Sequence, residues 1–195
     1  MRATAQADAA QRAAEWDHLA AALNTYGVIH VAPTLPPEGD LPSRPTDLFL
    51  ALNHSPDVRL QEAAVLLLLT HPGLAAADVA AVSSLHGVQR DRAQRRYVAA
   101  AALQRMWRSR IQLALGPQEE IPSAYVKEMD LPSLDEDFGR RTLMELSAQE
   151  ERLYGYDAWA GYASLMDLFL AEMERKGWGQ LTPAAAPHVT NARPR

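Results

Sequence analysis

Residues 90–115, which read RDRAQRRYVAAAALQRMWRSRIQLAL, decide the fold of this chain. The stretch contains no glycine or proline, and Gly116-Pro117 ends it. At about 100° per residue its large apolar side chains fall on one broad arc, which predicts a single long amphipathic helix. Four consecutive alanines, residues 99–102, leave room for another helix to approach closely. The residues on the apolar arc are Tyr97, Leu103, Met106, Trp107, Ile111 and Leu113.

The same stretch carries seven arginines and a single acid, Asp91, whereas residues 118–151 carry ten acids against three bases. Because opposite charges attract, we expect the acidic run 135–137 to dock on the arginine helix. Arg110 falls on the apolar arc itself, so its guanidinium is expected either to snorkel out to solvent or to find a carboxylate or another set of acceptors. The predicted ion-pair residues are Arg108 and Arg110 on the helix and Asp135, Glu136 and Asp137 in the acidic run.

An alternative hypothesis is that the arginines stay free and bind phosphate, in nucleic acid or in a nucleotide. A planar guanidinium suits bidentate contact with phosphate. The net charge of −5 argues against a general nucleic-acid coat but leaves room for a local basic face. The candidates for this role are Arg92, Arg95, Arg96 and Arg105.

The apolar periodicity along the rest of the chain predicts an all-α fold, a single-domain irregular bundle of six to seven helices around the long arginine-rich helix. Residues 1–32 are expected to form an N-terminal helix and a short extended piece. Residues 33–45 contain five prolines and are expected to form a linker. Residues 46–178 are expected to form the helical core domain, and residues 179–195 a disordered tail.

The segment LFLALNHSPDVRLQEAAVLLLL, residues 48–69, resembles one HEAT-type helix pair. Its Ser-Pro-Asp turn caps a second helix, predicted over 57–70, which is apolar almost all round and is expected to be the central core element. No second copy follows at a fixed period, and a solenoid needs at least about three repeats, so the resemblance implies one αα-hairpin. In the next helix, predicted over 74–85, Asp78 is expected on the outer face.

Several classes of chemistry are excluded by what the sequence lacks. It contains no cysteine, which removes disulfides, thiolate metal sites and cysteine nucleophiles. The first 16 residues show no apolar segment of a signal peptide, and the longest run of large aliphatic residues, Val65–Leu69, is far too short to cross a membrane. We therefore expect a cytoplasmic protein without membrane contact. No catalytic residue, metal site or cofactor is predicted, because no known catalytic or phosphate-loop pattern occurs.

One spacing on the N-terminal helix is similar to a catalytic motif. Arg12 is followed by five residues and then His18, which resembles the motif of HEPN-type ribonucleases. The resemblance implies that this pair would contact and activate an RNA phosphodiester. Two features depart from the family pattern: Ala13 stands where a polar residue is often found, and the pair lies early in the chain.

A longer resemblance covers roughly residues 46–175. The runs SPDVRLQEAAVLLLLTHP, LQRMWRSRIQLALG and LPSLDEDFGRR, followed by a tyrosine-rich helix, resemble a poorly characterised bacterial family of all-helical proteins. Genes of this family tend to neighbour those of minimal nucleotidyltransferases, which implies a protein partner and no assigned catalytic residue. The leading hypothesis is thus a non-enzymatic interaction or regulatory protein. Nucleic-acid binding and HEPN-like ribonuclease activity are the alternatives, and the oligomeric state stays open.

Overall fold

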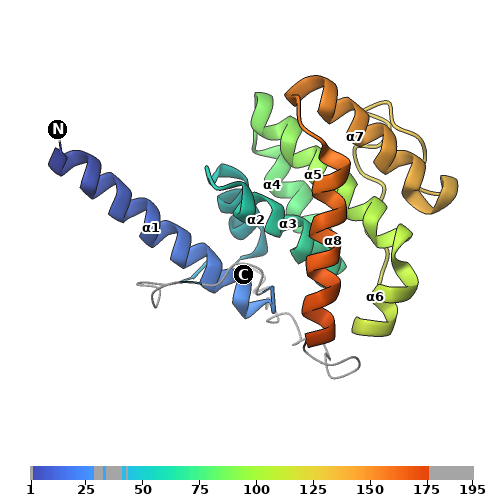
Figure 1. The fold of residues 1–195 in the computed structure, drawn as a ribbon, viewed down its shortest axis with the longest axis horizontal. Helices are drawn as coiled ribbons and strands as arrows, with labels where there is room; N and C mark the ends of the chain where they lie inside the picture. Colours follow the sequence, from blue (N-terminus) through green and yellow to red (C-terminus); the bar gives the residue numbers. More distant parts are fainter. Residues whose placement is uncertain (1, 29–32, 34–40, 43, 176–195) are drawn as a thin grey trace, which may run out of the picture.

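The computed structural model describes residues 2–28, 33, 41–42 and 44–175, with the side chains from residue 10 onward. The described part is all-α, as predicted, with eight α-helices and two short 3-10 helices (Figure 1). The predicted short extended piece, most of the linker and the tail lie outside the described residues. The α-helices are α1 (Arg2–Thr25), α2 (Pro45–His54), α3 (Val58–Thr70), α4 (Ala75–Ser83), α5 (Gly87–Met106), α6 (Arg108–Leu115), α7 (Arg140–Tyr154) and α8 (Ala158–Arg175).

Helices α2 and α3 form the predicted αα-hairpin. Pro56 and Asp57 make its turn, and the Asp57 carboxylate caps α3 by accepting the backbone N–H of Arg59. A second hairpin, α4 and α5, stacks on the first, because α4 packs on α2 and α5 packs on α3. The sequence conceals this second pair, since the short α4 and the arginine-rich α5 share no repeat pattern with α2 and α3.

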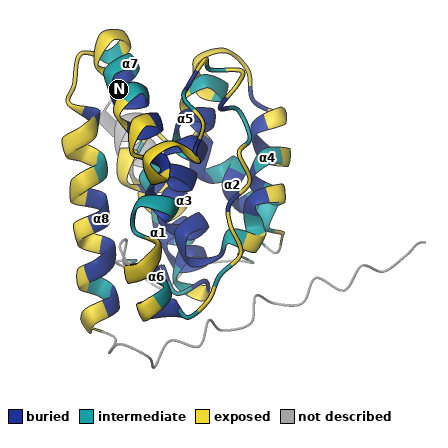
Figure 2. Cartoon of the chain, turned by 90° about the vertical axis from the view of Figure 1, so that its right-hand side faces the viewer, coloured by how far each residue is buried: buried dark blue, intermediate teal, exposed yellow. Residues whose placement is uncertain are grey.

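Helix α3 is the centre of the core, as predicted. Every residue from Ala63 to Thr70 is buried, and Figure 2 shows buried residues concentrated in α3 and α5. Its neighbours include α1, α5 and α8. No single described helix has both the length and the apolar content needed to cross a membrane. The segments Val58–Thr70 and Pro72–Ser83 reach that threshold only together, across a 115° bend.

The predicted single helix over 90–115 is wrong in its second half. The chain leaves helical geometry at Trp107, with φ −107° and ψ 15°, and a separate helix, α6, follows. The break lets α6 turn its own apolar residues Ile111, Ala114 and Leu115 into the core. Upstream of the break, the alanines at 99–102 are fully buried, as expected for a site of close approach.

The element that approaches these alanines is the turn before α7. A Cβ built on Gly139 would lie 3.0 Å from the carbonyl oxygen of Ala102. The sequence predicts a helix from Leu134, but α7 begins only at Arg140. Asp137, Phe138 and Gly139 all have left-handed φ values, of 47°, 53° and 82°, so no α-helix can pass through them.

Candidate interaction sites

The arginines of α5 are held by groups of the same chain. Arg95 Nε donates to the Asp91 carboxylate at 2.9 Å, and its Nη1 donates to the Gln149 side chain at 3.3 Å. Arg96 donates from its two Nη atoms to Gln61 Oε1 and Asn53 Oδ1, each at 2.8 Å. These two candidates for phosphate binding are therefore structural groups that tie α5 to its neighbours.

Arg96 is the hub of a partly buried polar cluster whose members come from α2, α3, α5, α7 and α8. Burial lowers the pKa of Arg96, and its Nε has no hydrogen-bond partner. Burial also raises the pKa of Glu62 and of Glu150, while the charge of Arg96 opposes both shifts. Tyr162 donates its hydroxyl to Glu150 at 3.1 Å. The cluster joins helices far apart in sequence.

Arg92 and Arg105, the other two candidates, differ in exposure. Arg92 is exposed and lies over the ring of Tyr154, 4.9 Å from its centroid. Arg105 has a side chain only 11% exposed, and its Nη1 donates to the backbone oxygens of Ala101 and Ile121. The four arginines thus do not form the row of free guanidinium groups that nucleic-acid binding needs.

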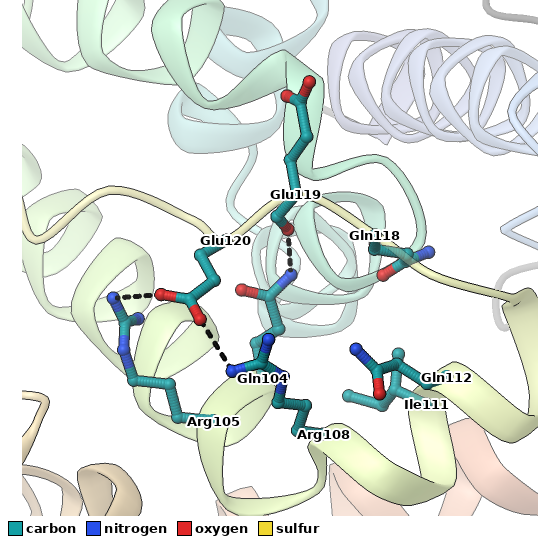
Figure 3. Close-up of a pocket in the computed structure, with 8 residues that line it drawn as sticks. All are labelled: Gln104, Arg105, Arg108, Ile111, Gln112, Gln118, Glu119 and Glu120. Atoms are coloured by element: carbon teal, nitrogen blue, oxygen red, sulfur yellow. Dashed lines mark hydrogen bonds and ion pairs between the residues drawn. The ribbon is translucent and has the colours of Figure 1, made fainter.

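A small pocket at the α5–α6 break shows how the arginine helix is neutralised (Figure 3). Glu120 points into it and contacts both Arg108, at 2.8 Å, and Arg105, at 3.6 Å, whereas the carboxylate of Glu119 points away. Gln104 fixes this loop from α5, since its amide donates to the Glu119 carbonyl and accepts the N–H of Ile121. The residues around this pocket therefore fix the loop at 119–121 to α5 and α6.

The acidic run does pack against the arginine helix, since the turn Glu136–Gly139 contacts α5, but the ion pairs predicted for this contact are wrong. Arg108 pairs with Glu120, and Glu136 pairs with Arg141 at 2.6 Å. Arg110 is exposed over the Trp107 ring, 5.2 Å from its centroid, and forms no ion pair with the described residues. Glu120 lies only five residues after the end of α6, in a loop that runs beside Arg105 and Arg108, and it therefore takes the place predicted for the acidic run. Asp135 and Asp137 stay exposed, like Glu136.

The two arginines beside the break should respond differently to truncation. We expect Arg105→Ala to lower the free energy of unfolding by about 2 kcal/mol, because it removes the donor to the Ile121 carbonyl and the packing of a largely buried side chain. Arg110→Ala removes an exposed side chain and should cost less than about 0.5 kcal/mol. Urea unfolding of the two variants measures the difference, and equal losses would contradict the assigned burial.

The Arg12–His18 pair lines an open groove of about 1420 Å³ between α1 and the α2–α3 turn. Arg12 is exposed and His18 is half-buried. Trp16 crosses the groove and donates its Nε1–H to Asp57 at 3.0 Å. The structure thus places both residues of the ribonuclease-like pair in one groove.

The turn before α7 presents an exposed aromatic residue that the sequence prediction missed. Phe138 is 78% exposed, the highest fraction among the exposed large apolar side chains of the described residues. The sequence signal was available: a glycine directly follows an aromatic residue in a run of acids, which suits a left-handed turn better than a first helical turn.

Among the described residues, no group of three or more histidine, aspartate or glutamate side chains is placed to hold a metal ion. No protein-family model, curated protein or solved structure matches this chain. Any functional conclusion therefore depends on the geometry of the described residues.

Proposed function

We propose that this chain is a non-enzymatic helical interaction protein whose partner binds the turn around Phe138. The observation that carries the proposal is that Phe138 is exposed and has a left-handed backbone conformation, which L-residues rarely adopt. Each left-handed non-glycine residue costs about 1–2 kcal/mol, and Asp137 and Phe138 are consecutive. Such backbone persists only where the surroundings fix it, and it often marks functional sites.

The flanks of the turn are held firmly. On one side Leu134 is buried, and on the other the Thr142 hydroxyl donates to the backbone oxygens of Pro132 and Ser133. Gly139 rests against the backbone of Ala102. The Phe138 ring is therefore presented on a rigid support, which lowers the entropy that a partner must remove on binding.

The chemistry of the turn indicates the kind of partner. An exposed aromatic anchor fits an apolar pocket, and such anchors carry much of the binding energy of interfaces. Exposed Asp135 and Asp137 flank the ring without an ion pair among the described residues. A pocket with a basic rim would complement them. The nucleotidyltransferase-like protein that the family resemblance suggests is the first partner to test.

The alternatives have less support from the geometry. Of the four candidates for phosphate binding, Arg95, Arg96 and Arg105 are already bonded within the chain, and Arg92 is the exposed one. For the ribonuclease pair, the same groove also contains His54, Arg59 and Glu15, but each is engaged within the chain: His54 Nδ1 lies 2.9 Å from the Leu50 carbonyl oxygen, Arg59 pairs with Asp57, and Glu15 accepts from Gln11. We therefore favour protein binding over both.

Affinity capture at native expression tests the proposal. Phe138→Asp should lose the captured partner, because losing a central anchor costs at least about 2 kcal/mol, roughly 30-fold in affinity. Leu153→Asp, at an exposed apolar position of α7, is the matched control and should retain the captured partner. Both variants should unfold within about 0.5 kcal/mol of the unmodified chain. A partner that Phe138→Asp retains, or a chain that captures nothing at any salt concentration, contradicts the proposal.

A further inference from the structure

Helix α1 is the longest described helix, at 24 residues, and its N-terminal half projects away from the body (Figure 1). Residues 10–15 are exposed, and burial begins around Trp16 and Asp17. Its composition is rich in alanine, yet isolated helical segments this short are marginal in water. A second element packed along the projecting half would stabilise it.

On the groove wall formed by α2 and the α2–α3 turn, the two aspartates are already engaged. Asp57 accepts from Trp16 and pairs with Arg59 at 2.9 Å, and Asp47 pairs with Arg44 at 2.7 Å. The rest of the lining combines small or apolar residues, including Ala13, Ala14, Ala51 and Pro56, with the ionisable Arg12, Glu15, His18 and His54. The groove therefore suits a helix that has small side chains and that carries charges opposite to those of Arg12 and Glu15.

The size of the groove fits the same kind of occupant. Its volume is about 1420 Å³. A helix about 10 Å in diameter fills that volume over about 18 Å, which corresponds to about 12 residues. Residues 10–15 of α1 are exposed and have small side chains at Ala10, Ala13 and Ala14, so this part of the helix presents a narrow surface of the kind that the groove accepts.

When the α1 helices of two copies of this chain lie side by side and antiparallel, the charges of one helix match the opposite charges of the other. A two-fold axis between Ala13 and Ala14 places Arg12 of one copy opposite Glu15 of the other, twice per pair. Arg12 forms no ion pair with the described residues, and Glu15 has only a neutral partner, Gln11, at 3.1 Å. Each charge therefore lacks a counter-charge within its own described chain.

From these observations we infer that α1 of a second copy occupies the groove, which gives a two-fold symmetric homodimer. The α1 end of the molecule lies opposite the start of α7 (Figure 1), so the dimer leaves both Phe138 turns open. Two linked turns would bind a partner with paired sites more tightly than one turn does. The dimer surface is separate from the proposed partner site.

Sedimentation velocity of the full chain over a wide concentration range tests the dimer. The unmodified chain is expected to dimerise reversibly. Ala14→Arg inserts a large cation at the axis and should yield monomers, whereas Ala76→Arg, at an exposed position of α4, should leave the dimer unchanged. Circular dichroism of each variant should stay that of the unmodified chain.

Charge reversal then tests the register. Arg12→Glu should weaken the dimer by at least about tenfold at low salt, because two attractions become repulsions. The double variant Arg12→Glu with Glu15→Arg should restore it. A chain that is monomeric at every concentration, a dimer indifferent to Arg12→Glu or Ala14→Arg, or a double variant as weak as the single one would overturn the inference. None of these results bears on partner capture by Phe138, so the two proposals fail separately.

Discussion

Replacing Gly139 by alanine is expected to lower the free energy of unfolding by about 3 kcal/mol. The left-handed φ of 82° contributes about 1–2 kcal/mol for any L-residue with a Cβ. The new Cβ would also lie 3.0 Å from the oxygen and 3.1 Å from the Cα of Ala102. Both are backbone atoms of α5 that cannot rotate away, and overpacking of this kind costs about 1–3 kcal/mol.

Gly155 provides the matched control, because its φ of 74° is also left-handed but a Cβ added there would meet no atom within 4 Å. Gly155→Ala should therefore show the backbone cost alone, about 1 kcal/mol. Urea unfolding with equal m-values for both variants gives the comparison. Equal losses would show that the turn before α7 does not press against α5. Since that contact supports Phe138, a large loss for Gly139→Ala also links fold stability to the proposed partner site.

The fold class and the core were predictable because they depend on local periodicity. The run of buried residues in α3 and the buried alanines at 99–102 follow directly from apolar spacing. The break at Trp107 was not predictable in the same way, since the stretch contains no glycine or proline. The break depends on tertiary contacts: Gln104 and Arg105, at the end of α5, donate to the backbone oxygens of Glu119 and Ile121 in the following loop.

The electrostatic prediction placed the acidic run beside α5 correctly but named the wrong ion pairs, for a related reason. The balance of charge correctly indicates that acids after the arginine helix neutralise part of it, and Glu120 does so for Arg108. Glu128 likewise accepts from Gln94 and lies near Arg90. A sum of charges does not say which acid lies beside which arginine, however, so it cannot decide whether Glu120 or the acidic run 135–137 pairs with Arg108. The short loop after α6 places Glu120 beside Arg108, and the left-handed backbone at Asp137 and Phe138 leaves the acidic run exposed.

Asp78 shows the same limit for a single side chain, and it carries the second large prediction. It was expected on the outer face of α4, but it is buried and forms no hydrogen bond or ion pair with the described residues. Burial raises the pKa of Asp78 to about 7, and the charge of Arg96 only partly opposes this. The hydroxyls of Tyr97 and Tyr125 are also buried without partners. The site therefore favours the neutral carboxyl group.

Asp78→Asn is expected to stabilise the protein at about pH 8 by on the order of 3 kcal/mol. In the unfolded chain the Asp78 carboxyl loses its proton near pH 4, whereas in the folded chain it keeps it up to about pH 7. Between these values the folded state binds more protons, so the stability of the unmodified chain falls as pH rises, by up to about 1.4 kcal/mol per pH unit. The asparagine variant lacks this loss.

The measurement is urea unfolding of both chains from about pH 4 to about pH 8, with the difference taken at each pH so that other titrating groups cancel. The stabilisation by Asp78→Asn should be small at the acid end, grow as pH rises and level off above about pH 7. Asp135→Asn changes an exposed carboxylate and should shift stability by less than about 0.5 kcal/mol at any pH. A stabilisation by Asp78→Asn that does not change with pH would mean that the carboxyl group ionises normally. Asp78 would then have to be open to water or paired, and α4 could not pack against α2 and α5 in the way that buries it.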